Sequence, residues 1–250
     1  MNAESEQPQK GKRIAKVMAR AGLCSRRDAE RWIADGRVRV DGEVLSTPAL
    51  TVTEANLVEV DCQALPGAAP VRLWRYHKPP GLLTSHADPQ GRPTVFDRLP
   101  KALGRVISIG RLDLNSEGLL LLTNDGDLAR RLELPETGWA RRYRVRVHGI
   151  VDEKKLQGLE NGITVSGVSY GPIRVELDNQ QRANAWLMVS LNEGRNREIR
   201  KVMEHLGLEV NRLIRVAFGP FQLGGLRRGA VAEVRGKVLR EQLGPDWAPS

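Results

Sequence analysis

Several features that mark common classes of protein are scarce in this sequence. Cysteine occurs only twice, at Cys24 and Cys62, which fits neither a disulfide scaffold nor a cysteine-based zinc site. The longest unbroken aliphatic run, Leu119–Leu122, is far shorter than the roughly 20 apolar residues that cross a bilayer. The N-terminal segment MNAESEQPQKGKR has no apolar core of the kind found in a secretory signal. We therefore expect a reduced, cytoplasmic protein that has no membrane partner.

Motifs for cofactors and metals are also missing. The sequence contains no Gly-x-Gly-x-x-Gly and no Walker-type Gly-Lys-Ser/Thr segment, which argues against an enzyme that uses a nucleotide cofactor. Its four histidines, at positions 77, 86, 148 and 205, show no metal-ligand spacing. We therefore predict that the protein uses no cofactor and no metal ion.

Positive charge is plentiful. The 250 residues include 39 Lys or Arg against 30 Asp or Glu, which gives a formal net charge of +9. A surplus of this size indicates a polyanionic partner, with nucleic acid as the first choice. A chain of this length accommodates one large domain, or a small domain plus a medium one, with a hydrophobic core.

The first part of the chain shows two helices and a hairpin. Apolar residues between Ile14 and Ala21 recur at spacings of three and four, and Gly22 is placed to end that helix. Ser25 and Asp28 form a capping-box pattern at the start of a second helix, which stops near Gly36. Alternating valines around Asp41-Gly42 then predict a β-hairpin. We expect a disordered tail over 1–10, a helix–helix–hairpin domain over 11–64 and a linker over 65–70.

The second part has more strands than helices. Strand-like runs occur at 71–77, 105–109, 142–147, 173–177, 185–191 and 230–234, and helical patterns occur at 127–132, 152–159 and 196–205. Because helices and strands do not alternate regularly, the pattern predicts an α+β fold with a mixed, mainly antiparallel sheet and flanking helices. This domain should extend over 71–240, followed by a C-terminal tail over 241–250.

Basic residues are clustered rather than spread. Residues 10–40 hold ten Lys or Arg against three acids, whereas residues 41–70 hold five acids and no base. Such segregation favours docking of one face onto phosphates, although a solvated helix surface is the simpler alternative. In the second part, Arg142, Arg144 and Arg146 would share one face of a strand, where like charges are costly without an opposing anion.

Two acidic segments are candidates for chemistry. In Gly110-Arg-Leu-Asp-Leu-Asn-Ser-Glu-Gly118, Asp113 follows an apolar strand and could be presented in a cleft, although a strand-end aspartate is more often a turn or cap residue. Asp125 and Asp127 suggest a metal pair, but a turn followed by Asp127 as a helix N-cap explains them more simply. The segment Lys78-Pro-Pro-Gly81 predicts a rigid loop.

Together these segments resemble a known enzyme family. GRLDLNSEGLLLLTNDG is similar to the catalytic motif of the pseudouridine synthases of the small-subunit-type (RsuA) branch, and KPPGLLTS, RRYRVRV and EGRNREIRKVMEHLGLEVNRLIRVAFGPFQL match further segments in the family's order. Ser116 stands where the family usually has Thr. GRPTVFDRLP and EGRNREIRK are most similar to members that modify the large ribosomal subunit. Residues 12–52 resemble the S4 RNA-binding domain that precedes the catalytic domain in this branch.

The resemblance implies a reaction and its site residues. The enzyme would isomerise a uridine of ribosomal RNA to pseudouridine without a cofactor, with 23S RNA as the expected target. Separately, we expect the protein to be a monomer. The family's catalytic aspartate maps onto Asp113, its basic partner onto Arg200 and its active-site tyrosine onto Tyr143, while Arg111 would support the flipped nucleotide. RNA-binding residues expected in the small domain are Ser25, Arg26, Arg27, Arg37 and Arg39. Two alternatives remain open: a non-catalytic RNA-binding assembly factor, and a metal-dependent nuclease that uses Asp113, Asp125 and Asp127.

Overall fold

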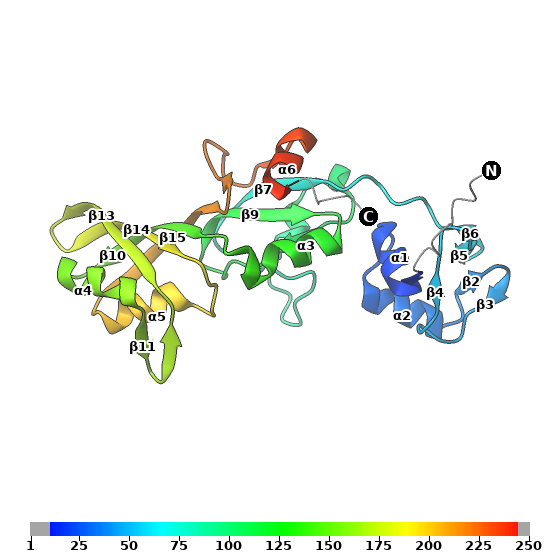
Figure 1. The fold of residues 1–250 in the computed structure, drawn as a ribbon, viewed down its shortest axis with the longest axis horizontal. Helices are drawn as coiled ribbons and strands as arrows, with labels where there is room; N and C mark the ends of the chain where they lie inside the picture. Colours follow the sequence, from blue (N-terminus) through cyan, green and yellow to red (C-terminus); the bar gives the residue numbers. More distant parts are fainter. Residues whose placement is uncertain (1–10, 245–250) are drawn as a thin grey trace, which may run out of the picture. The chain divides into compact units, whose positions relative to one another are not determined.

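The computed structural model describes residues 11–244, and these form two compact units (Figure 1). The first unit comprises the described residues up to Val71 together with Leu103–Val106, and the second comprises Arg72–Ala102 and the residues from Ile107 onward. The tail predicted over 1–10 and the last six residues of the tail predicted over 241–250 lie outside the described residues. No helix within 11–244 combines the length and the apolar character needed to span a bilayer.

The two helices of the first unit begin and end as the sequence predicts. Helix α1 (Ile14–Arg20) buries Ile14 and Met18 completely, and Gly22 follows it with a φ of +83° that favours glycine. Helix α2 (Arg26–Ala34) begins with a full capping box: the Ser25 Oγ accepts from the Asp28 N–H at 3.0 Å, and the Asp28 carboxylate accepts from the Ser25 N–H at 3.2 Å.

Short strands complete the first unit. The predicted hairpin is present as β2 and β3, which turn through Asp41 and Gly42, both at positive φ. A four-stranded sheet has the order β3-β2-β5-β6, and a second pair joins β1 to β4. The bounds are β1 Lys12–Arg13, β2 Val38–Val40, β3 Glu43–Val44, β4 Thr51–Val52, β5 Val58–Val60 and β6 Gln63–Ala64. Valines from these strands pack with Ile14, Met18 and Ile33 into the core of the unit.

The second unit is built on one nine-stranded sheet. Its main path runs β13-β14-β10-β15-β9-β7-β17, with β16 paired to β15 and β8 paired to β9. Only the β15–β9 pairing is parallel among the described strands, so the prediction of a mixed, mainly antiparallel α+β fold is confirmed. The bounds are β7 Leu73–Lys78, β8 Ile107–Ile109, β9 Glu117–Thr123, β10 Arg141–His148, β13 Ile173–Gln181, β14 Asn184–Leu191, β15 Glu209–Phe218, β16 Phe221–Gln222 and β17 Val231–Glu233.

Helices flank this sheet, and a small separate hairpin accompanies it. Helix α3 contacts β8 and β9, α4 contacts β13, and α5 contacts β15 and the hairpin strand β11. The bounds are α3 Gly126–Glu133, α4 Glu153–Gly158, α5 Glu198–His205, α6 Gly236–Leu243, β11 Ile163–Val165 and β12 Val168–Tyr170. Short 3-10 turns lie at Phe96–Arg98, Lys101–Leu103, Pro135–Thr137 and Leu159–Asn161.

Several elements differ from the sequence-based expectation, among them β9, β15 and α6. Strand β9 was not predicted because it lies inside the sheet with all seven residues buried, so it shows no alternation of polar and apolar residues. The ten-residue strand β15 was also missed. Helix α6 continues to Leu243, three residues beyond the predicted end of the domain at 240, because Leu239 and Leu243 share a face that is buried.

Candidate active site

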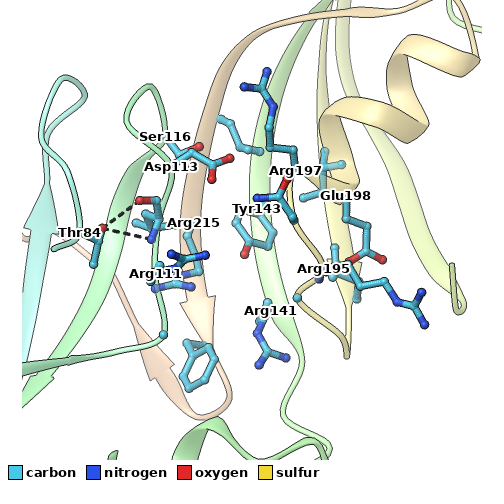
Figure 2. A pocket seen from close by; sticks show the side chains of 18 of the residues that line it. Thr84, Arg111, Asp113, Ser116, Arg141, Tyr143, Arg195, Arg197, Glu198 and Arg215 are labelled. Atoms are coloured by element: carbon cyan, nitrogen blue, oxygen red, sulfur yellow. Dashed lines mark hydrogen bonds between the residues drawn. The ribbon is translucent and has the colours of Figure 1, made fainter. Parts of the chain in front are cut away.

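A cavity of about 560 Å³ opens in the second unit, and the predicted catalytic residue lies in it (Figure 2). Its lining comes from the loop before β9, from β10 and β15, and from the segment that leads into α5. The charged and aromatic side chains of the wall include Arg111, Asp113, Arg141, Tyr143, Arg195, Arg197, Glu198, Arg215 and Phe218. Apolar side chains, including Leu112 and Leu213, complete the wall.

The loop that carries Asp113 is held at several points. Gly110, at a φ of +67°, donates its N–H to the Glu133 carboxylate at 2.6 Å. The Thr84 hydroxyl donates to the Leu112 carbonyl at 2.9 Å, and the Asp113 carbonyl accepts from the Ser116 N–H at 3.0 Å. Since the backbone is fixed on both sides of Asp113, its half-buried carboxyl group is presented to the cavity from a defined position (Figure 2).

Lys78 fixes the same loop through its backbone. It has no exposed surface, and its ammonium group donates to the carbonyls of Asp113 at 3.1 Å, Leu114 at 3.3 Å and Ser116 at 2.8 Å. Burial lowers the pKa of Lys78 to about 8, although the negative charges of Asp113 and Glu117 act to raise it. The sequence indicated only a rigid loop here. The direct bonding of Lys78 to the Asp113 loop is a tertiary feature that no local pattern signals.

Glu117 and Gly118 set the position of β9 against β15. The buried Glu117 carboxylate binds the guanidinium groups of Arg212 and Arg228, the latter at 2.6 Å. Although burial opposes ionisation, these two arginines hold the pKa of Glu117 below its ordinary value. Gly118 has a φ of +104°, and a Cβ there would lie 2.3 Å from the Arg215 carbonyl oxygen. Only glycine therefore allows β9 to approach β15 this closely.

Strand β10 separates Tyr143 from the exposed arginine row. Tyr143 is buried and faces the cavity, whereas Arg142, Arg144 and Arg146 lie on the opposite, exposed face as their alternation predicts. Four arginines of β10 flank Tyr143 in the sequence, and of these only Arg141 lines the same cavity. The paired strand β15 adds Arg215 to the cavity wall.

The exposed row is partly compensated. Arg144 pairs with Asp178 at 3.0 Å and stacks over Trp186, and Arg142 donates to the Gln222 side chain at 2.9 Å. These contacts lower the cost of placing three like charges on one strand face.

Arg200 contacts the Asp113 loop without lining the cavity. Its guanidinium donates to the Val210 carbonyl at 2.9 Å and to the Asn115 carbonyl at 3.5 Å, two residues after Asp113. Burial and the neighbouring Arg197 charge lower the pKa of Arg200, while the negative charge of Asp113 opposes this shift. Arg200 is therefore close enough to Asp113 for their charges to interact. Arg111 is exposed and lines the cavity beside Asp113.

The segment from Glu193 to Glu198 adds residues to which the sequence assigned no role. Arg195 and Arg197 are exposed, whereas Glu198 is buried and accepts from the Arg195 N–H at 3.0 Å. Burial raises the pKa of Glu198 to about 7, and the hydrogen-bonded Glu193 contributes in the same direction. The clustering of Arg195 and Arg197 was visible in the sequence, but the burial of Glu198 beside them was not.

The predicted RNA-binding residues of the first unit differ in how free their side chains are. Arg26, Arg27 and Arg39 are exposed. The Ser25 hydroxyl is used in the capping box, and Arg37 is paired with Asp61 at 2.5 Å and lies over the Trp32 ring. These positions are compatible with phosphate contacts from Arg26, Arg27 and Arg39, whereas Arg37 would have to share its charge with Asp61.

The acidic residues considered for a metal-dependent nuclease do not converge. Asp125, rather than the predicted Asp127, caps α3, because its carboxylate accepts from the N–H groups of Asp127 and Leu128 at 3.0 and 2.7 Å. Neither Asp125 nor Asp127 lines the cavity that holds Asp113. Within residues 11–244, no group of three or more His, Cys, Asp or Glu side chains is arranged to hold a metal ion.

Comparison with known proteins gives consistent matches over most of the chain. Residues 72–205 match the family model of RNA pseudouridylate synthases, and residues 12–58 match that of the S4 domain. A Rickettsia felis protein named as an uncharacterized RNA pseudouridine synthase is 48% identical over 229 residues, which is 92% of this chain and 99% of the relative. The ribosomal large subunit pseudouridine synthase B of Salmonella typhi is 44% identical over 232 residues, which is 89% of this chain and 79% of the relative.

A solved structure supports the fold. A crystal structure of a pseudouridylate synthase superimposes with a TM-score of 0.66 at 24% identity, covering 93% of this chain and 99% of that one.

Proposed function

Because the chain belongs to the RNA pseudouridine synthase family, we propose that it converts a specific uridine of ribosomal RNA to pseudouridine, with Asp113 as the catalytic carboxylate. The substrate class is taken from the Salmonella typhi relative, whose name refers to the large ribosomal subunit. We extend this to 23S RNA as the target of this chain. Because the proposed substrate is ribosomal RNA, we also propose that the enzyme works in the cytoplasm, and that it does so as a monomer.

The position of Asp113 is the observation that carries this proposal. Its carboxyl group lies in a cavity with Tyr143, on a loop that Lys78 and Thr84 hold through backbone carbonyls. A carboxylate so placed could attack C1′ of the ribose or remove a sugar proton, and both roles need the ionised form. Arg200, which donates to the Asn115 carbonyl of the same loop, supplies a positive charge close to this carboxylate. In both roles the bond between C1′ and N1 breaks and C5 then bonds to C1′.

Tyr143 and the basic residues have supporting roles in this proposal. The Tyr143 ring would stack on the uracil, and its hydroxyl would help to move the C5 proton. Reaching Asp113 requires the nucleotide to leave its stack, at a cost of a few kcal/mol. The RNA backbone would be held in that state by Arg111 on the cavity wall. The first unit, which matches the S4 domain, would contribute Arg26, Arg27 and Arg39.

Isolated RNA offers a direct test. Ribosomal RNA from cells that lack this protein is incubated with the wild type or with Asp113→Asn, and pseudouridine is mapped in 16S and 23S RNA. We expect one new pseudouridine in 23S RNA with the wild type and none with Asp113→Asn, at RNA affinities within a few-fold of each other. A wild-type rate in the variant would refute the role of Asp113. Modification of 16S RNA alone would overturn the choice of 23S RNA.

A further inference from the structure

Arg215 is a buried cation without a counterion. Only 3% of its surface is exposed, although it lines the cavity that holds Asp113. Its Nε donates to the Leu119 carbonyl at 2.7 Å, while its Nη2 is buried and has no hydrogen-bond partner. No carboxylate of the described residues forms an ion pair with it. Buried donors and charges that lack partners are rare in folded proteins because their desolvation is not repaid.

A second guanidinium increases this imbalance. Arg141 lies beside Arg215 in the cavity wall, and both stand against the Phe218 ring, at 5.0 and 5.4 Å from its centroid. Arg141 donates to the carbonyl of Asn192 at 2.7 Å. Burial lowers the pKa of Arg141, and the like charge of Arg215 adds to this effect, while Tyr143 and Glu198 act in the opposite direction. Two neighbouring cations in a poorly solvated wall indicate that an electron-rich group is supplied from outside the protein.

The depth of the arginines indicates which part of a nucleotide supplies it. Arg111, Arg195 and Arg197 are exposed and form the rim of the cavity, whereas Arg215 is buried. A nucleotide that enters a cavity inserts its base and leaves its phosphates at the rim. Arg215 is also directly paired with Tyr143 in the sheet, so the two side chains leave neighbouring strands on the same face. The group that meets Arg215 is therefore part of the base.

We propose that Arg215 is a further catalytic residue, which binds a carbonyl oxygen of the inserted uracil and stabilises the negative charge that the base acquires as it leaves the sugar. This rests on the proposed function. When the bond between N1 and C1′ breaks, its electron pair stays with uracil and spreads over N1, O2 and O4. The guanidinium has only hydrogen-bond donors and a fixed charge, which suits this anion better than neutral uracil. C5 then bonds to C1′, the C5 proton leaves, N1 takes up a proton, and the net change is an isomerisation.

Arg215→Met and Arg215→Lys test the proposal on the full chain. Single-turnover rates, RNA affinity and thermal unfolding are measured on the 23S RNA fragment that the wild type modifies. We expect Arg215→Met to lower the single-turnover rate by about 10²-fold or more, the scale seen when a preorganised donor is removed. RNA affinity should stay within about threefold, since the contact strengthens mainly during bond cleavage. Arg215→Lys should recover part of the rate because it restores the charge.

Thermal unfolding separates this role from a structural one. Replacing an unpaired buried cation by an apolar side chain of similar length is expected to leave the melting temperature unchanged or to raise it. A structural arginine would instead lower it. The rim residue Arg195 provides a contrast, because Arg195→Met should weaken RNA binding more than it slows the chemical step.

A substrate with a better leaving group gives an independent readout. 5-Fluorouracil carries negative charge more easily than uracil, so cleavage of its bond to the sugar should depend less on Arg215. The C5 fluorine prevents the final proton loss, and disappearance of the original nucleoside from RNA digests is therefore measured. The defect of Arg215→Met should be at least tenfold smaller with 5-fluorouridine at the target position than with uridine.

Several results would overturn the proposal. An equal defect with both bases would show that Arg215 does not stabilise the leaving base. A weaker affinity with an unchanged rate at saturating RNA would make Arg215 a phosphate contact. A wild-type rate in Arg215→Met, with Asp113→Asn inactive, would refute this inference alone, whereas a wild type that forms no pseudouridine would refute the proposed function itself.

Discussion

Among single residues, Tyr143 has two possible roles, packing or stacking through its ring and proton transfer through its hydroxyl. Its side chain is 9% exposed and faces the cavity, and its neighbours there include Asp113 and Arg215. A core tyrosine would need only its ring. A tyrosine that moves the C5 proton would also need its hydroxyl, and the two roles can therefore be separated by removing that one atom.

Tyr143→Phe keeps the ring and removes the hydroxyl. We expect turnover to fall by about 10²-fold or more, the usual scale for removal of acid–base assistance, with RNA affinity preserved. Single-turnover assays and binding measurements on the same RNA fragment would check this. Full activity in the variant would restrict Tyr143 to stacking.

Glu198 is a buried carboxyl group beside the cavity whose ionisation opposes folding. Burial raises its pKa from 4.5 to about 7, so between these values the folded protein holds a proton that the unfolded chain has released. The stabilisation linked to this proton is complete below about pH 4.5 and disappears as the pH rises through 7. A shift of this size corresponds to about 3 kcal/mol at most.

Glu198→Gln should remove this pH dependence, because glutamine stays neutral and its side-chain oxygen can still accept from the Arg195 N–H. We expect the variant to match the wild type near pH 4.5 and to exceed its free energy of unfolding at pH 8 by up to about 3 kcal/mol. Urea unfolding at pH 4.5, 6 and 8 measures the difference. If the free energies of unfolding of the two proteins changed with pH in the same way, Glu198 would have to ionise normally.

At the scale of elements, the parallel pair β9–β15 places the site. Strand β9 begins directly after the Asp113 loop, and β15 carries Arg215. The two strands are in register at Glu117 with Ile214 and at Gly118 with Arg215. The position of Asp113 relative to Arg215 therefore depends on the close approach that Gly118 permits.

Gly118→Ala is expected to disturb both stability and activity. The added Cβ would collide with the Arg215 backbone, and alanine disfavours the φ of +104°. We expect the free energy of unfolding to fall by about 3 kcal/mol or more. Gly67→Ala is a suitable control, since no atom lies within 4 Å of its added Cβ and its φ is ordinary. Similar stabilities for the two variants, measured by urea unfolding, would contradict this role of Gly118.

At the scale of the whole molecule, the basic cluster at the start of α2 and the predicted catalytic residues belong to different units. The cavity with Asp113 is lined only by residues of the second unit, whereas Arg26 and Arg27 lie at the start of α2 in the first. Residues 12–58 match the S4 domain model, which supports a role in RNA binding. We therefore expect changes in the first unit to affect affinity more than turnover.

The double variant Arg26→Ala/Arg27→Ala tests this division. We expect weaker RNA binding, with turnover at saturating RNA little changed. The slope of the logarithm of the binding constant against the logarithm of the salt concentration should become shallower by about 0.7–0.9 for each phosphate that is no longer neutralised. The control removes the same charge from exposed arginines of the second unit, as Arg174→Ala/Arg182→Ala. Binding on a ribosomal RNA fragment is measured at several salt concentrations. Equal effects of both pairs would indicate that net charge alone matters.

Local patterns in the sequence were sufficient for much of the fold. The capping box at Ser25, the turn at Asp41-Gly42 and the two faces of β10 were all predicted, because caps, turns and strand alternation depend on residues close together in the chain. The family resemblance, carried by several ordered motifs, was confirmed by the comparisons. The residue roles inferred with it stay predictions.

The tertiary structure alone decided which buried charges meet at the site. Lys78 contacts the Asp113 loop 35 residues away, and the strand that carries Arg215 pairs with β9 almost 100 residues earlier. Buried strands such as β9 show no alternation, and no spacing in the sequence reveals which charge will lack a partner. That depends on the packing of distant segments, because the energy of a buried charge is set by every group around it.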